Sequence, residues 1–316
     1  MSPADPLFAN KFHFFDRVAP DATMMEWGPV IGAEYDAPLS EYVSPPVRVE
    51  NRTIPGPQGE IPVRLYWPEN KTAHALPGLV WFHGGAFMFG GLDMNEGDVA
   101  SRELAHRAGA VVMSVDYRLV TPERKFPTSQ IDGLAAAQWF KQNAAELGVD
   151  PNRITISGAS AGACLTASVM LQLRDREELD GVRNILIYPI AHSTLPEFSA
   201  ELTEKLTEVP RHIVFSLEDT TWINSNMGYE TVDASYYCYP GDSNNLAGVT
   251  ETLIINSEYD SLRASGEKYF EQLLAAGVNA TQVTAMGAIH GHLNWYPADC
   301  KVMDETLDMM AEFISK

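Results

Sequence analysis

The stretch that decides the fold is residues 154–162, Ile-Thr-Ile-Ser-Gly-Ala-Ser-Ala-Gly. Its first four residues predict a strand, and the apolar, Ala-rich segment 163–173 that follows predicts a helix. Ser160 lies between them, at the centre of a Gly-x-Ser-x-Gly pattern. A sharp strand-to-helix turn with small neighbours holds such a serine exposed as a nucleophile. The alternative, a glycine-rich turn without chemistry, is disfavoured by the strand and helix on either side.

Around this stretch, short β-rich runs alternate with helical ones along the chain. The predicted strands are 47–53, 61–67, 79–82, 111–115, 154–157, 185–188, 253–256 and 282–286. The predicted helices are 94–108, 129–147, 161–174, 264–276 and 298–314. This alternation is typical of an α/β fold with a mostly parallel sheet covered by helices.

Two segments do not follow the alternation. Residues 1–45 are rich in aromatic side chains, and residues 193–245 lie between two predicted core strands. Open α/β folds bind ligands at the carboxyl edge of the sheet. We therefore expect both segments to form a cap over that edge, with residues 46–192 and 246–316 as the core.

Composition and charge narrow the function classes. The chain has 45% hydrophobic and 20% charged residues, a composition typical of globular proteins. Its 316 residues are enough to bury a large core, so it needs no disulfides or metals to fold. A net charge of −20 opposes binding to nucleic acid or to an anionic membrane. There is no apolar run of membrane-spanning length, no signal-peptide pattern and no paired cysteine spacing. We expect a cytoplasmic protein with free thiols.

A second candidate element is His83-Gly84-Gly85, directly after the predicted strand 79–82. A backbone with few side chains at this position can turn its N–H groups toward a developing oxyanion. The alternative is a simple turn between a strand and a loop. The serine pattern downstream favours the first interpretation.

A nucleophilic serine needs a base, and the base needs a carboxylate to orient it. On a sheet of this kind these residues follow the serine in the order acid, then histidine, each just after a strand. Asp260 and His290 satisfy this order and both follow predicted strands. Glu258 and His292, each two residues away, are alternatives for the same roles.

These elements resemble those of the hormone-sensitive-lipase-like esterases, a family with the α/β-hydrolase fold. The stretches that carry the resemblance are His83-Gly84-Gly85, residues 115–119, 126–127 and 148–154, the serine turn, residues 258–263 and 289–291. It implies a Ser160, Asp260 and His290 triad, with the backbone N–H groups of Gly84, Gly85 and Ala161 as oxyanion donors. The family's cap is built from the N-terminal segment and an insert, as in the two segments above.

The resemblance also implies an activity. It points to hydrolysis of small-molecule carboxylic esters with short acyl chains, without cofactor or metal, by a protein that can form a homodimer. Amidase, lactonase and carbamate hydrolase activities use the same triad and stay open as alternatives. A small-molecule binding protein on the same scaffold is the alternative outside enzymes.

The sequence departs from the family at a few positions. Ala86 stands where a third glycine is usual, and Ala159 where Asp or Thr is usual. After Asp260, residues 261–266 read Ser-Leu-Arg-Ala-Ser-Gly where the family usually has Pro-Leu-Arg-Asp-Glu-Gly, and the missing acidic residue predicts the loss of a supporting contact. None of these changes removes a catalytic atom.

Aromatic residues near the predicted site are candidates for the substrate pocket. They are Phe87, Phe89, Trp222 and Tyr259. The alternative for each is ordinary core packing, which is the commoner role of an aromatic next to a core strand.

Overall fold

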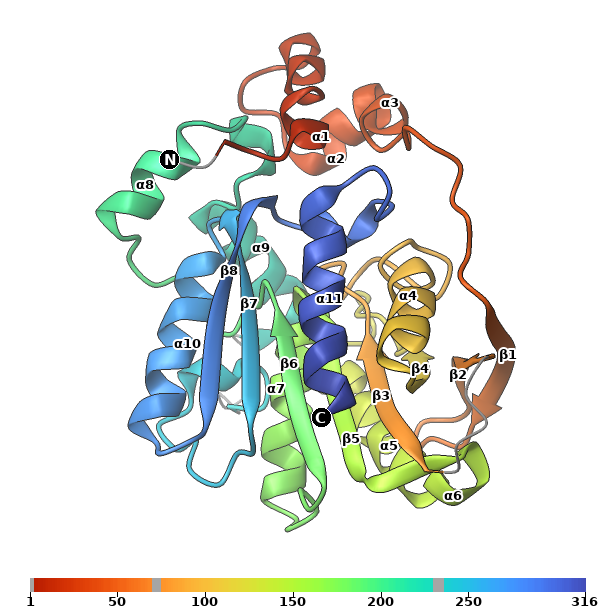
Figure 1. Cartoon of the computed structure of the whole chain (residues 1–316). Coiled ribbons are helices and arrows are strands. Elements are labelled where there is room, and N and C mark those ends of the chain that lie inside the picture. Colours follow the sequence, from red (N-terminus) through yellow and green to blue (C-terminus); the bar gives the residue numbers. More distant parts are fainter. Residues whose placement is uncertain (1–2, 70–74, 230–235) are drawn as a thin grey trace.

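The computed structural model describes residues 3–69, 75–229 and 236–316, and it contains an eight-stranded sheet (Figure 1). The strand order is β1-β2-β4-β3-β5-β6-β7-β8; β2 runs antiparallel to both of its neighbours, β1 and β4, and the remaining neighbours are parallel. The strands are β1 Val47–Ile54, β2 Ile61–Pro68, β3 Leu76–Phe82, β4 Val111–Val115, β5 Val149–Ala159, β6 Val182–Ile187, β7 Thr252–Tyr259 and β8 Ala280–Ile289. All eight predicted strands are therefore confirmed, as is the α/β-hydrolase arrangement.

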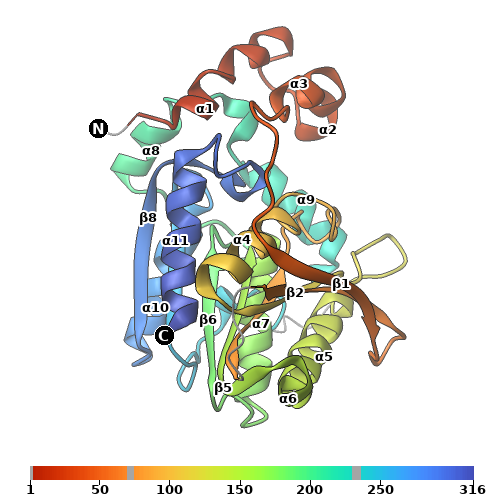
Figure 2. The same ribbon diagram turned by 45° about the vertical axis from the view of Figure 1, so that its right-hand side comes forward.

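Both faces of the central strands are buried, which explains their unbroken apolar runs. In β3, Leu79 and Trp81 face one hydrophobic cluster, whereas Val80 and Phe82 face the other. Helices α4 and α11 cover the first face, and α5 and α7 cover the second (Figure 2). The sheet is thus held between two layers of helices.

The helices of the core are α4 Val99–Ala108, α5 Thr128–Gln142, α6 Ala144–Leu147, α7 Ala161–Arg174, α10 Arg263–Ala275 and α11 Lys301–Ser315. Two of the predicted helices differ clearly from these bounds. The predicted helix 94–108 begins only at Val99, and Gly97 just before it packs tightly against the backbone of Gly91. The predicted helix 129–147 is broken at Asn143, whose side chain donates to the carbonyl of Trp139.

The N-terminal segment and the insert lie side by side above the sheet (Figure 2). The first contains α1 Pro6–Ala9, η1 Phe12–Arg17, α2 Met24–Trp27, η2 Gly28–Gly32 and α3 Ala33–Tyr35; the second contains α8 Ala200–Leu206, η3 Arg211–Ile213, α9 Leu217–Met227 and η5 Pro240–Asp242. His212 joins them: it stacks on Phe15 at 4.9 Å, and its Nε2 lies 2.7 Å from the carbonyl oxygen of Ala19. Residues 230–235 of the insert lie outside the described residues.

The N-terminal segment is also tied to the end of the chain. The N–H of Asp5 donates to the carbonyl of Gly287 at 2.9 Å, and the Asp5 carboxylate accepts from the N–H of Val302 at 3.2 Å. Lys11 donates to the carbonyls of Tyr35 and Ala37, and its ammonium lies 4.6 Å from the ring centre of Trp295. No helix in the described part of the chain is long and apolar enough to cross a bilayer.

Candidate active site

Ser160 occupies the turn between β5 and α7 in a strained conformation. Its φ of +54° and ψ of −116° lie outside the regions that a residue with a side chain prefers. The turn is so tight that a Cβ on Gly162 would collide with the carbonyl oxygen of Phe82, and one on Gly158 would collide with the backbone of Gly162. The two glycines of the pattern are therefore required by close backbone approach.

Ser160, His290 and Asp260 form one chain of hydrogen bonds. The Nε2 of His290 lies 2.9 Å from Oγ of Ser160, and its Nδ1 lies 2.7 Å from Oδ2 of Asp260. The Asp260 side chain is fully buried, and its other oxygen accepts the N–H of Leu262 at 2.9 Å. Strands β7 and β8 extend to the residues just before Asp260 and His290. The carboxyl ends of three strands thus bring the three side chains together.

The two alternative residues have other partners. Glu258 pairs with Lys205 of α8 at 2.9 Å and accepts the N–H of Gly287 at 2.6 Å. His292 lies with Nδ1 3.1 Å from Oγ of Ser257 and with Nε2 3.0 Å from Oγ1 of Thr306. Burial lowers the pKa of His292 to about 3, so its ring stays neutral. Neither residue hydrogen-bonds to Ser160.

Three backbone N–H groups near Ser160 differ in whether they are already hydrogen-bonded within the chain. In the described residues, the N–H groups of Gly85 and Ala161 make no hydrogen bond within the chain. The N–H of Gly84, which we expected among the oxyanion donors, donates instead to Oε2 of Glu96 at 2.5 Å. Gly85 has φ +110°, and a Cβ there would collide with the carbonyl of Phe89. This glycine is therefore needed for the turn itself.

Two aromatic rings enclose the imidazole of His290. Tyr188, which follows β6, meets it edge-on with ring centres 4.9 Å apart. Phe215 of the insert does the same at 4.9 Å and 79°. The insert therefore contacts the candidate base directly.

The four aromatic residues expected near the pocket lie in different environments. Phe87 is fully buried in the cluster under α5 and α7. Tyr259 is also buried, at the end of β7, and its hydroxyl contacts Lys205 and Glu208. Phe89 and Trp222, the latter on α9, are 44% and 47% exposed. Only these last two present their rings to solvent.

Ser265, in the segment where the family has acidic residues, has a structural role in this protein. Its hydroxyl oxygen accepts the N–H groups of Ala191 and His192 and lies 2.9 Å from Nδ1 of His192. The loop that leads into the insert is thus still anchored to α10. The loss of a supporting contact from the acidic residue stays a prediction.

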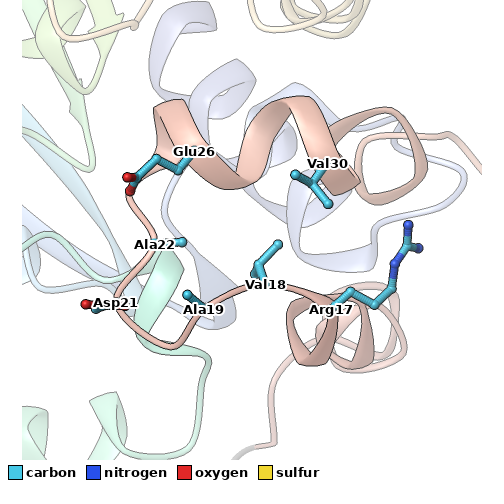
Figure 3. Close-up of a pocket in the computed structure, with 7 residues that line it drawn as sticks. All are labelled: Arg17, Val18, Ala19, Asp21, Ala22, Glu26 and Val30. Atoms are coloured by element: carbon cyan, nitrogen blue, oxygen red, sulfur yellow. The ribbon is translucent and has the colours of Figure 1, made fainter.

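A separate surface pocket of about 310 Å³ opens in the N-terminal segment (Figure 3). It is lined by Arg17, Val18, Ala19, Asp21, Ala22, Glu26 and Val30. Val18 and Val30 point towards each other, while Arg17 and Glu26 stand at opposite ends. Arg17 is paired with Glu34 at 2.8 Å. None of the lining residues belongs to the Ser160 hydrogen-bond chain, so the pocket is distinct from it.

Sequence reasoning missed Glu96, Tyr188 and Phe215. Glu96 lies in the loop before α4, and Tyr188 and Phe215 lie beyond β6. No spacing pattern singles them out, because each reaches the site through tertiary packing. The available signal was weak: Glu96 is one of three acidic residues, with Asp93 and Asp98, in the loop after His83-Gly84-Gly85.

Comparison with known proteins places this geometry in a family. Residues 79–294 match the model of an alpha/beta hydrolase fold family. The chain is 36% identical to the carboxylesterase NlhH of Mycobacterium tuberculosis, over 79% of this chain and 77% of that protein. It is 33% identical to the esterase LipI of the same organism, over 80% and 77%. An esterase structure from Pyrobaculum calidifontis superposes with a TM-score of 0.78 at 32% identity, covering 99% of this chain and 98% of that one. The chain belongs to the hormone-sensitive-lipase-like esterases of the α/β-hydrolase fold family.

Proposed function

We propose that the chain hydrolyses small carboxylic esters through an acyl-enzyme on Ser160. His290 takes the hydroxyl proton as Oγ attacks the ester carbonyl carbon, and Asp260 holds the imidazole in the required tautomer. His290 then gives that proton to the leaving alcohol. Water cleaves the acyl-enzyme by the same route, returning the proton to Oγ. The observation that carries the proposal is the unbroken hydrogen-bond chain from Ser160 through His290 to Asp260.

The oxyanion in this proposal is stabilised by the backbone N–H groups of Gly85 and Ala161. Both are without a partner in the described residues, and both lie next to Ser160 or in the turn beside it. Losing one such donor costs about 10²–10³-fold in kcat in a comparable protease. The Gly84 N–H, being bonded to Glu96, has the different role argued below.

The substrates in this proposal are esters with short acyl chains. The resemblance to the family suggests this range, and the relatives named as an esterase and a carboxylesterase support ester chemistry. The N-terminal segment and the insert would act as a cap that limits pocket depth, with Phe89 and Trp222 at its mouth and Phe87 and Tyr259 behind it. The three cysteines are buried and unpaired, which fits a cytoplasmic location.

The test is hydrolysis of p-nitrophenyl esters from acetate to decanoate by the wild type and by Ser160→Ala. We expect a maximum at short chains and loss of turnover in the variant. Ser168→Ala, on the helix that directly follows Ser160 and also buried, is the matched control and should keep full activity. An active Ser160→Ala protein would refute the nucleophile assignment.

Amide, lactone and carbamate substrates pass through the same tetrahedral oxyanion and are tested beside the esters. Rates on an ester and an amide with the same acyl group decide between the two classes. If neither is turned over and a fluorophosphonate does not label Ser160, the scaffold serves binding instead. The expected homodimer is checked separately by light scattering.

A further inference from the structure

Glu96 is a buried carboxylate directly behind the candidate oxyanion turn. Its side chain accepts three hydrogen bonds: from the N–H of Gly84 at 2.5 Å, from the hydroxyl of Tyr188 at 2.7 Å and from Nδ2 of Asn294 at 3.4 Å. Its own carbonyl accepts Nε1 of Trp81 at 2.8 Å. One side chain thus joins the turn after β3, the residue after β6 and the short helix after β8.

The geometry places this carboxylate against the nucleophile turn as well. A Cβ built on Gly84 would lie 2.8 Å from Oε2 of Glu96 and 3.3 Å from Cβ of Ser160. Gly84 is therefore packed between the carboxylate and the serine. Because Gly85 is the next residue, the direction of its free N–H depends on how Gly84 is held.

Tyr188 extends the influence of Glu96 to the base. This tyrosine has φ +36°, a left-handed conformation that is costly for a residue with a bulky side chain. Its ring meets the imidazoles of His290 and His292 edge-on, at 4.9 and 5.1 Å. The bond from its hydroxyl to Glu96 fixes the ring in this position.

Burying a carboxylate here is costly, because no Lys or Arg in the described part of the chain pairs with Glu96. Burial raises the pKa of Glu96, against the opposing effect of the hydrogen bonds from Tyr188 and Gly84. An apolar side chain of similar size would avoid this cost but would leave two buried donors without an acceptor. The position therefore serves the alignment of those donors.

We propose that Glu96 is a positioning residue that sets the oxyanion turn against Ser160 and, through Tyr188, the ring of His290. The inference rests on the proposed function, because it assigns Glu96 to the same reaction. It predicts that Glu96 affects the transition state more than substrate binding. Its loss should lower kcat and leave KM nearly unchanged.

The test compares Glu96→Gln and Glu96→Leu with the wild type. Gln keeps an oxygen that can accept from Gly84, so kcat should fall by about tenfold or less. Leu removes both acceptors, and we expect a loss of about 10²-fold, near that of one missing oxyanion donor. A short-chain trifluoromethyl ketone, to whose carbonyl carbon Oγ of Ser160 adds to give a bound oxyanion, should bind Glu96→Leu more weakly by the same factor.

Each kcat is divided by the concentration of Ser160 that a fluorophosphonate labels when the labelling reaction has gone to completion. This normalisation removes the effect of misfolded protein. Glu103→Gln is the matched control, since Glu103 is also a buried carboxylate that accepts a tyrosine hydroxyl, that of Tyr42. It should keep wild-type kcat. If Glu96→Leu does not fold, Tyr188→Phe carries the test: it removes one anchor of Glu96 and should lower kcat about threefold to tenfold.

An unchanged kcat per labelled serine in Glu96→Leu, or in Tyr188→Phe if the Leu variant does not fold, with only a lower melting temperature, would overturn the inference and leave Glu96 a packing residue. An inactive wild type would instead reject the proposed function. A wild type that loses activity in Ser160→Ala but not in the Glu96 variants rejects the inference alone.

Discussion

The ammonium of Lys205 lies 2.9 Å from the carboxylate of Glu258, and the two side chains are only 5% and 1% exposed. Lys205 belongs to α8 of the insert and Glu258 to β7 of the core. Glu258 is also two residues from Asp260. A buried ion pair thus fastens the insert next to the acid of the candidate triad.

Removing the cation from this pair should destabilise the protein strongly. Lys205→Met leaves the Glu258 carboxylate buried beside an apolar side chain, and breaking a buried pair in this way costs about 3–5 kcal/mol. Urea unfolding should show this loss. The double variant Lys205→Met, Glu258→Leu should recover most of it. Lys268→Ala, which breaks an exposed pair with Glu271, should change stability by less than about 1 kcal/mol. Equal losses of unfolding free energy in Lys205→Met and Lys268→Ala would contradict the role of the Lys205–Glu258 pair in stability.

Asp260→Asn tests which carboxylate orients the base. The amide favours the wrong imidazole tautomer, and a comparable substitution lowers kcat by about 10⁴-fold. Steady-state kinetics on a short-chain ester gives the answer. Glu258→Gln is the matched variant and should retain most of the kcat of the protein that folds. A loss of less than about tenfold in Asp260→Asn would move the role to Glu258.

His292 should make the protein less stable as the pH falls. Its folded pKa of about 3 lies below the ordinary 6.5, so the unfolded chain takes up the proton first. The contribution of the neutral His292 to the free energy of unfolding is complete above pH 6.5 and is lost progressively as the pH falls to about 3. Between pH 7 and 4.5 this amounts to about 2–3 kcal/mol. His292→Gln should lose that much less stability than the wild type over the same interval, as measured by urea unfolding. Parallel pH curves for the two proteins would exclude the effect.

Phe215→Ala tests the contact between the insert and the base. Edge-to-face aromatic pairs are worth about 0.5–1.5 kcal/mol, so a less restrained imidazole should lower kcat about twofold to tenfold. Phe198→Ala is the control, because Phe198 lies in the same insert but is exposed. It should leave kcat unchanged. If Phe215→Ala and Phe198→Ala have the same kcat in steady-state assays, the contact of Phe215 with His290 does not support catalysis.

The sequence predicted the sheet, the serine turn and the order of the acid and base, because each depends on local patterns. Gly158 and Gly162 are needed for backbone approach, and apolar periodicity located the strands that carry Asp260 and His290. What it could not supply was the surroundings of these residues. The bond from Gly84 to Glu96 depends on how the loop after β3 folds back, and the packing of Phe215 on His290 joins segments that are remote in sequence. The strand ends were underestimated for a similar reason, since pairing with neighbours extends β7 and β8 past their most apolar residues.

The attachment of Asp5 to Gly287 and Val302 has a consequence for biosynthesis. On the ribosome, the residues around Asp5 emerge long before their partners are translated. The aromatic N-terminal segment therefore cannot dock on the C-terminal part of the chain during most of synthesis, and its apolar side chains stay exposed to solvent. Contacts of such long sequence separation also slow closure of the fold. We expect nascent chains halted before residue 287 to be bound by chaperones and degraded by proteases at the N-terminal segment, and the completed chain to resist both.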